Sequence, residues 1–374
     1  MIAEAITHGH VIKKQANGDF AGLLRADLLF TCAENDIKTT TAQGLSTLTL
    51  HLSDKEVAPP VLLAPMAGIT DRPFRDLVMR FGAGMVVSEM VASQEMVQAK
   101  PGVRERAELS ADVENTAVQL AGREAHWMAE AARQVADRGA RVIDINMGCP
   151  AKKVTNGYSG SALLKTPDHA LALIEAVVGA VDLPVTLKTR LGWDDNLLNA
   201  PDVARRAQDA GIQMVTIHGR TRCQFYKGHA DWQAIRAVKE AVSIPVIANG
   251  DIVDTAAART ALRQSGADGV MVGRGAQGKP WLLAQICHDL YEAETPDIPT
   301  GHDLIDMVCA HYQSMLDFYG TDLGLRVARK HLGWYMDEAA TPAPLRRAVL
   351  TSRDPGEVLR LLADALSDTD EVAA

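Results

Sequence analysis

The residues best suited to chemistry lie in the stretch Asn146-Met147-Gly148-Cys149-Pro150-Ala151-Lys152-Lys153. This stretch follows an apolar run, residues 142–145, that is typical of a buried strand. Cys149 therefore lies where a strand passes into a loop, and loops on a rigid scaffold often carry catalytic residues. The two lysines that follow could favour a thiolate or hold an anionic ligand. This position favours a functional cysteine over a small buried hydrophobe.

Other polar residues end apolar runs in the same way. Lys188 could be a Schiff-base nucleophile or a cation placed against developing negative charge, and an ion pair with a neighbouring carboxylate is the structural alternative. Gln119 can donate to and accept from an imide edge. His218 could contact a phosphate or satisfy a buried hydrogen bond. Lysine, glutamine and asparagine around a phosphate site would suit the pyrimidine edge of a flavin.

Two glycine-containing segments, each at the end of a late apolar run, indicate a phosphate site. They are Asn249-Gly250-Asp251 and Gly273-Arg274-Gly275. Loops after the last two strands of a barrel often bind phosphate, because backbone N–H groups there face the anion. Taken alone, this pattern indicates a phosphate-bearing ligand, which aldolases, synthases and flavoenzymes share.

The elements that must position these residues form a repeat. Eight short apolar runs, each followed by a helical stretch, begin roughly 25 to 45 residues apart, which is the size of a βα unit. Near-continuous apolar strands separated by helices predict a parallel sheet covered by helices, and eight units predict a (β/α)₈ TIM barrel. Polar residues directly after the strands are then expected to meet at one mouth. The runs are residues 61–64, 85–88, 117–120, 142–145, 185–188, 214–218, 246–249 and 269–272.

The remaining segments have other patterns. Residues 1–45 lack periodicity and are expected to be a poorly ordered N-terminal extension, and residues 46–298 are expected to be the barrel, opening with an alternating strand over 46–52 that closes its N-terminal side. Residues 301–366 keep helical spacing and predict a small helical domain, and residues 367–374 form an acidic tail.

Composition narrows the class of protein. The net charge of −9 argues against a protein that coats nucleic acid non-specifically, although a local basic groove remains compatible with it. The five cysteines have no CxxC spacing, which argues against a zinc site or a disulfide framework and favours a reducing cytoplasm. No apolar run approaches the ~20 residues of a membrane span. We expect a cytoplasmic protein without a metal or membrane partner, and a monomer.

The motifs together resemble one family, the tRNA-dihydrouridine synthases. Residues 64–75 (APMAGITDRPFR) resemble that family's opening motif, and residues 146–154 resemble its active-site motif. Further blocks follow in the right order at residues 187–190, 216–222, 249–252 and 273–276. Residues 329–335 resemble the helical domain of the bacterial B-type (NifR3-like) subfamily. The similarity runs from about residue 46 to 360, and the first ~45 residues have no counterpart in it.

The resemblance implies an FMN enzyme that reduces the C5–C6 bond of uridine in the tRNA D-loop, with NADPH (or NADH) as reductant. It implies that Cys149 is the general acid and that the helical domain binds tRNA. The implied cofactor contacts are Pro65, Met66, Ala67, Gln119, Lys188, His218, Asn249, Gly250, Asp251, Gly273 and Arg274. The implied uracil and tRNA contacts are Asn146, Arg190, Lys152, Lys153, Arg326, Arg329 and Lys330.

Three alternatives stay open at this point. A flavin barrel acting on a free pyrimidine would share the cofactor site but would not need the basic helical module. A flavin- or RNA-binding regulator would need neither Cys149 nor Lys188 for binding alone. A phosphate-binding aldolase would use Lys188 as its Schiff base and would lack a yellow chromophore.

Overall fold

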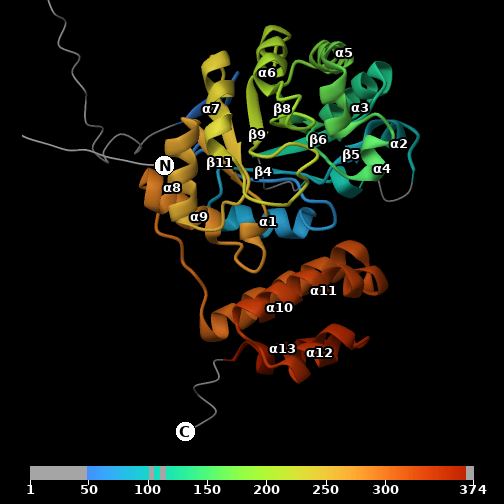
Figure 1. Cartoon of the computed structure of the whole chain (residues 1–374). Helices are drawn as coiled ribbons and strands as arrows, with labels where there is room; N and C mark the ends of the chain where they lie inside the picture. The colour runs from blue at the N-terminus through green and yellow to red at the C-terminus, as the bar shows by residue number, and fades with distance from the viewer. Residues whose placement is uncertain (1–48, 101–104, 110–114, 368–374) are drawn as a thin grey trace, which may run out of the picture. The chain divides into compact units, whose positions relative to one another are not determined.

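The structure, a computed structural model, describes residues 49–100, 105–109 and 115–367. Its centre is a closed parallel barrel (Figure 1), in which each strand pairs with the next along the chain and the first strand also pairs with the last. The barrel strands are β3 (Val61–Leu63), β4 (Met85–Val87), β6 (Thr116–Ala121), β7 (Val142–Met147), β8 (Val185–Arg190), β9 (Met214–His218), β10 (Val246–Asn249) and β11 (Gly269–Val272). The predicted (β/α)₈ barrel is therefore confirmed. A two-residue strand, β5 (Val91–Ala92), adds to the edge of β6 and was not predicted.

Helices cover the outside of the barrel because their apolar faces pack on the outward-facing residues of the strands. The first, α1 (Arg72–Phe81), begins with the Asp71 carboxylate accepting from the Phe74 amide and ends at Gly82 in a left-handed conformation. The other barrel helices are α2 (Ser93–Val97), α3 (Ala125–Asp137), α4 (Lys152–Thr155), α5 (Pro167–Val178), α6 (Ala200–Asp209), α7 (Trp232–Ala241), α8 (Thr255–Ser265) and α9 (Leu282–Tyr291). Short 3₁₀ turns lie at Glu105–Ala107, Gly160–Lys165 and Arg274–Ala276.

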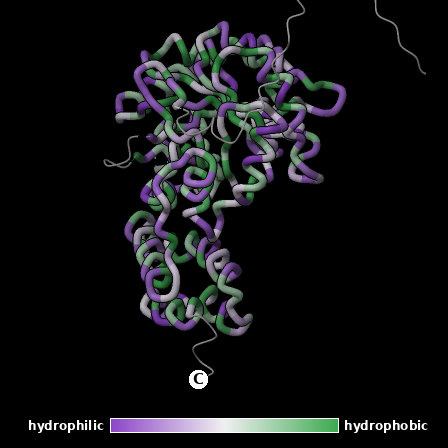
Figure 2. The backbone as a smooth tube through the Cα atoms, turned by 90° about the vertical axis from the view of Figure 1, so that its left-hand side faces the viewer, coloured by the Kyte–Doolittle hydropathy of each residue, from purple (hydrophilic) through white to green (hydrophobic). Residues whose placement is uncertain are grey.

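Four more helices follow the barrel in sequence and are orange to red in Figure 1. They are α10 (Gly301–Tyr319), α11 (Thr321–Glu338), α12 (Ala343–Thr351) and α13 (Pro355–Leu366), and they share a hydrophobic core of their own. Hydrophobic and hydrophilic residues alternate along both the barrel helices and these four (Figure 2). The Phe74 ring of α1 contacts this group, lying 4.9 Å from the His331 ring and 5.8 Å from the His311 ring.

An antiparallel hairpin lies at the N-terminal end of the barrel. It joins β1 (Leu50–Leu52) to β2 (Lys55–Val57), and its apolar side chains cluster with inward-facing barrel residues such as Met85 and Met214. The strand predicted over 46–52 is thus described only from Leu50, since residues 46–48 lie outside the described residues. The predicted extension at 1–45 and nearly all of the acidic tail lie outside them as well. Within the described ranges, no helix is both long and apolar enough to span a membrane.

The hairpin gives a test of how the barrel is closed. Leu52 is fully buried in the cluster, whereas His51 on the same strand faces solvent. We expect Leu52→Ala to lower the free energy of unfolding by about 2–5 kcal/mol through cavity formation. His51→Ala, the matched control, should change it by less than about 0.5 kcal/mol. Urea unfolding of both variants measures this free energy. A loss for Leu52→Ala as small as that for His51→Ala would show that the hairpin is not part of the core.

Candidate functional site

A cavity of about 860 Å³ opens at the C-terminal ends of the barrel strands. Every residue that the sequence predicts for the cofactor lines it, together with Cys149, Asn146 and Arg190. Parallel strands bring these residues together because all eight carboxyl ends point the same way. Among the described residues, no group of three or more His, Cys, Asp or Glu side chains is arranged to hold a metal ion.

The backbone of Cys149 is held on both sides. Its N–H donates to the Asn146 side-chain oxygen at 3.0 Å, and the Gly148 N–H donates to the same oxygen at 3.2 Å. Its carbonyl accepts from the Ser161 hydroxyl at 2.8 Å and from the Ser161 N–H at 3.2 Å. The half-buried thiol is therefore presented to the cavity from a fixed turn rather than from a free loop.

A buried polar layer lies beneath this turn. The strand register places Gln119, Asp144 and Thr186 side by side on β6, β7 and β8. The Asp144 carboxylate accepts from Gln119 Nε2 and from the Thr186 hydroxyl, both at 2.7 Å, and Gln119 Oε1 accepts from Asn146 Nδ2 at 2.8 Å. Burial raises the pKa of Asp144, against the opposing effect of these two hydrogen bonds. Because an amide nitrogen can only donate, the Asp144 oxygen orients the Gln119 amide, which in turn orients the Asn146 amide toward the Cys149 turn.

Lys188 occupies the next inward position of β8, beside Asn146 on β7. Its ammonium donates to Asn249 Oδ1 at 2.9 Å, and Asn249 Nδ2 donates to the Met271 carbonyl at 2.8 Å. Burial, reinforced by the charge of Arg190, lowers the pKa of Lys188 to about 8. The hydrogen bonds thus tie the lysine to the predicted phosphate-binding segment at 249–251.

Arg190 is buried and holds backbone from two loops. Its guanidinium donates to the carbonyls of Gly148 at 2.8 Å and of Thr221 and Phe225 at 2.9 Å. Burial lowers the pKa of Arg190 to about 10. The side chain lines the cavity, so its predicted contact with uracil stays a prediction, and its donors already join the Cys149 turn to the loop after β9.

The loop after β3 carries Pro65, Met66 and Ala67 at the cavity wall. The Glu89 carboxylate accepts from the N–H groups of Gly68 and Ile69. The same loop is also contacted from α11, where the Lys330 ammonium lies 3.4 Å from the Gly68 carbonyl. Lys330, predicted as a tRNA contact, is therefore also a contact of this loop.

Like Lys330, the other four predicted tRNA contacts do not line the cavity. Lys152 and Lys153 are exposed on α4, directly after the Cys149 turn. Arg326 is exposed and Arg329 is half-buried, both on α11.

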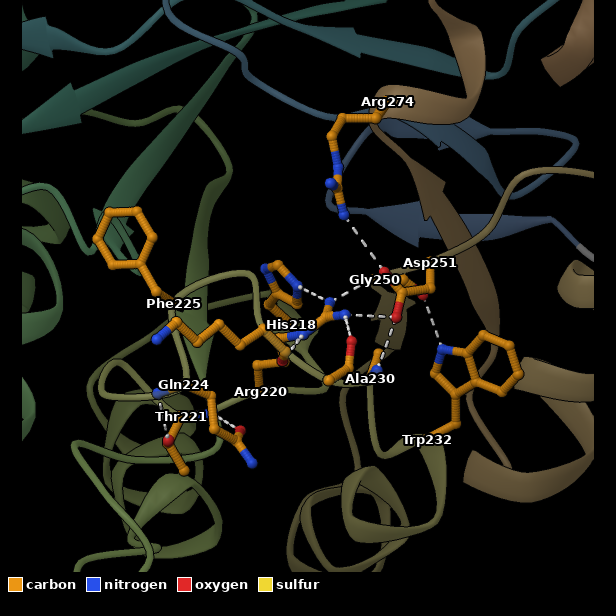
Figure 3. A network of polar contacts seen from close by, with 12 residues as sticks. His218, Arg220, Thr221, Gln224, Phe225, Ala230, Trp232, Gly250, Asp251 and Arg274 are labelled. Atoms are coloured by element: carbon orange, nitrogen blue, oxygen red, sulfur yellow. Dashed lines mark hydrogen bonds and ion pairs between the residues drawn. The ribbon is translucent and has the colours of Figure 1, made fainter.

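Several residues of the site escape the sequence analysis. Phe225 and Tyr226, on the loop after β9, line the cavity, and the Tyr226 ring lies 5.6 Å from the Arg190 guanidinium and 5.3 Å from that of Arg274. Arg220 on the same loop forms the centre of a polar network (Figure 3). Asp144 could have been found, because it is the charged residue of an apolar strand and stands two positions before Asn146, on the same face.

Comparison with known proteins agrees with this geometry. A family model described as dihydrouridine synthase matches residues 62–370. The chain belongs to the dihydrouridine synthase family. It is 63% identical over 325 residues to a probable tRNA-dihydrouridine synthase of Rhodobacter capsulatus, covering 86% of this chain and 99% of that one. It is 46% identical to tRNA-dihydrouridine synthase B of Vibrio vulnificus, covering 80% of this chain and 92% of that one. The family predicted from the motifs is thus confirmed, and the chain is an oxidoreductase.

A solved structure shares the fold. Histamine dehydrogenase from Rhizobium sp. 4-9 aligns with a TM-score of 0.51 at 13% identity, covering 73% of this chain and 51% of that chain. At this identity the likeness supports the barrel alone.

The lowered pKa of Lys188 makes a prediction about pH. The ammonium is charged below about pH 8 and loses its charge as the pH rises through that value. For FMN, the cofactor that the resemblance implies, we expect the affinity to fall roughly tenfold between about pH 7 and pH 9, as the charged fraction of Lys188 falls. Fluorescence titration measures this, with Lys188→Met as the comparison. The variant should bind FMN more weakly at pH 7, and its affinity should not change with pH. A parallel decline of affinity in both proteins would show that Lys188 is not the group responsible for the pH dependence.

Proposed function

We propose that the protein reduces the C5–C6 double bond of uridine in the D-loop of tRNA to dihydrouridine, with FMN as cofactor and NADPH as reductant. The observation that carries the proposal is one cavity that joins Cys149, Lys188 and the segments 249–251 and 273–274. The tRNA substrate is supported by the names of relatives that this chain covers almost completely.

The donor set of the cavity fits FMN. Gly250, in a left-handed conformation, and Gly273 line the cavity together with Arg274, and this set suits a phosphate group. Lys188 and Gln119 offer a cation and an amide to the pyrimidine edge of a flavin, and the volume lies within the range of cofactor pockets. When bound and reduced by NADPH, FMN would supply a hydride to C6 of the uracil.

The protein's own residues complete the addition. Hydride at C6 leaves negative charge on C5 and the C4 carbonyl, and a proton must then reach C5. Cys149 would supply that proton from Sγ, because Asn146 and Ser161 fix its turn at the cavity wall. Solvent returns the proton to the thiolate, so that one NADPH and one proton are consumed per uridine. Asn146 and Arg190 would face the base.

A uridine inside a folded tRNA reaches this cavity only when its base is extruded, which requires contacts to the backbone beyond the mouth. Lys152 and Lys153 stand exposed next to the Cys149 turn, and Arg326, Arg329 and Lys330 lie on one helix. We infer that these five cations hold phosphates. Since the protein carries a net charge of −9, binding would be local rather than diffuse.

Product analysis tests the proposal. Unmodified tRNA is incubated with the protein, FMN and NADPH, and dihydrouridine is measured by nucleoside mass spectrometry. Wild type should form dihydrouridine, and Cys149→Ala should form it at least about a hundredfold more slowly, because general acid catalysis contributes roughly that much. Cys223→Ser, which alters an exposed thiol outside the cavity lining, is the matched control and should keep wild-type activity.

Two outcomes would contradict the proposal. If wild type oxidises NADPH and holds FMN but leaves tRNA unmodified, the substrate is wrong and a flavin reductase of small molecules is the better account. If Cys149→Ala matches the control, the thiol is not the proton donor. Repeating the assay with NADH decides the reductant.

A further inference from the structure

The centre of the network in Figure 3 is Arg220, whose side chain is almost completely buried. Its Nε donates to the Lys227 carbonyl at 3.2 Å, and Nη2 donates to the Gly228 carbonyl at 2.7 Å and to Asp251 Oδ2 at 2.6 Å. Its Nη1 lies 3.0 Å from Asp251 Oδ1 and 3.3 Å from His218 Nε2. These contacts engage all five N–H groups of the guanidinium.

The contact with His218 has only one possible direction. A guanidinium has no acceptor and is always protonated, so Arg220 Nη1 must donate and His218 Nε2 must accept. A ring nitrogen that accepts carries no proton. His218 must therefore be neutral, with its proton on Nδ1.

The surroundings of His218 support a neutral ring. Burial, and then the charges of Lys188, Arg190, Arg220 and Arg274, lower its pKa well below 6.5. Gly250 closes the Cδ2 and Nε2 side, where an added Cβ would lie 2.8 Å from Cδ2. The second ring nitrogen points away from Arg220 (Figure 3). The histidine thus lines the cavity with one donor to offer, Nδ1–H.

Asp251 keeps Arg220 in place. Its carboxylate also accepts from the Ala230 N–H at 2.7 Å and lies 3.4 Å from Arg274. Burial alone would raise the pKa of Asp251, but the bonds from Arg220 and Ala230 outweigh it and lower the pKa. Both carboxylate oxygens of Asp251 are thus engaged in the network.

We propose that Arg220 is a positioning residue that fixes His218 as a neutral imidazole with its proton on Nδ1, so that the cavity offers an uncharged hydrogen-bond donor to an anionic ligand. The inference rests on the proposed function only in taking that ligand to be the phosphate-bearing cofactor FMN. The same guanidinium holds residues 227 and 228, and so anchors the loop that carries Phe225 and Tyr226 to the mouth.

The tautomer can be measured without flavin or tRNA. Nitrogen NMR of the flavin-free, full-length protein labelled with ¹⁵N-histidine distinguishes the two neutral tautomers from the imidazolium, and His218→Asn identifies the His218 signals. Wild type should show the Nδ1–H form. Arg220→Met should shift His218 toward the Nε2–H form. Arg274→Met, the matched control, removes another cation that contacts Asp251 but none that bonds His218, and should leave the tautomer unchanged.

A second pair of variants leaves Arg220 intact, in case Arg220→Met fails to fold. Asparagine can put its amide N–H where Nδ1–H stands, whereas glutamine reaches only the Nε2 position, next to Arg220. We expect His218→Asn to bind FMN within about threefold of wild type and His218→Gln to bind it at least about tenfold more weakly, as loss of one charge-assisted hydrogen bond implies.

Opposite results would overturn the inference. An Nε2–H or charged His218 in wild type, an unchanged tautomer in Arg220→Met, or tighter FMN binding by His218→Gln than by His218→Asn would each do so. Absence of tRNA reduction with the expected tautomer would instead count against the proposed function alone.

Discussion

The carboxylate of Asp144, buried inside the barrel beneath the cavity, is the group on which the rest of the site depends. It is an acceptor that receives Gln119 on one side and Thr186 on the other, and it thereby fixes which end of each amide faces the next residue. Through Gln119 and Asn146 this orientation reaches the backbone of Cys149. The strand register thus determines where the Cys149 thiol lies, because it sets these inward-facing polar residues side by side in an otherwise apolar barrel.

Above this layer the cavity gathers positive charge although the whole chain is acidic. Lys188, Arg190 and Arg274 line one hollow, and their mutual repulsion is offset by hydrogen bonds to Asn249, to loop carbonyls and to Asp251. Grouping these cations costs free energy, and a ligand with negative charge lowers that cost. A phosphate group and a reduced pyrimidine ring both bring such charge. A neutral His218 adds a donor without adding another charge.

The sequence predicts the barrel well because each strand is a short apolar run, and parallel topology then forces the strand ends to meet. For this reason the cavity residues at the strand ends, such as Gln119, Lys188 and Asn249, could be predicted without coordinates, whereas Phe225 and Tyr226 on a longer loop could not. The role of Asp144 could not be predicted, since it depends on the register that sets Gln119 and Thr186 beside it. Neither could the contact of Lys330 with Gly68 or the network of Arg220, because each depends on how a loop folds back in space.

The most direct test of the relay is the single-turnover rate of dihydrouridine formation by the flavin-loaded enzyme after substitution of Asp144. Asp144→Asn can keep the relay, because its amide oxygen accepts from Gln119 while its nitrogen donates to the Thr186 hydroxyl, and should stay within about threefold of wild type. Asp144→Leu removes the acceptor and should slow the reaction at least about tenfold, as an unsatisfied buried donor implies. Equal rates for the two variants, whether both fast or both slow, would contradict the account, since orientation by hydrogen bonding would then not control the thiol.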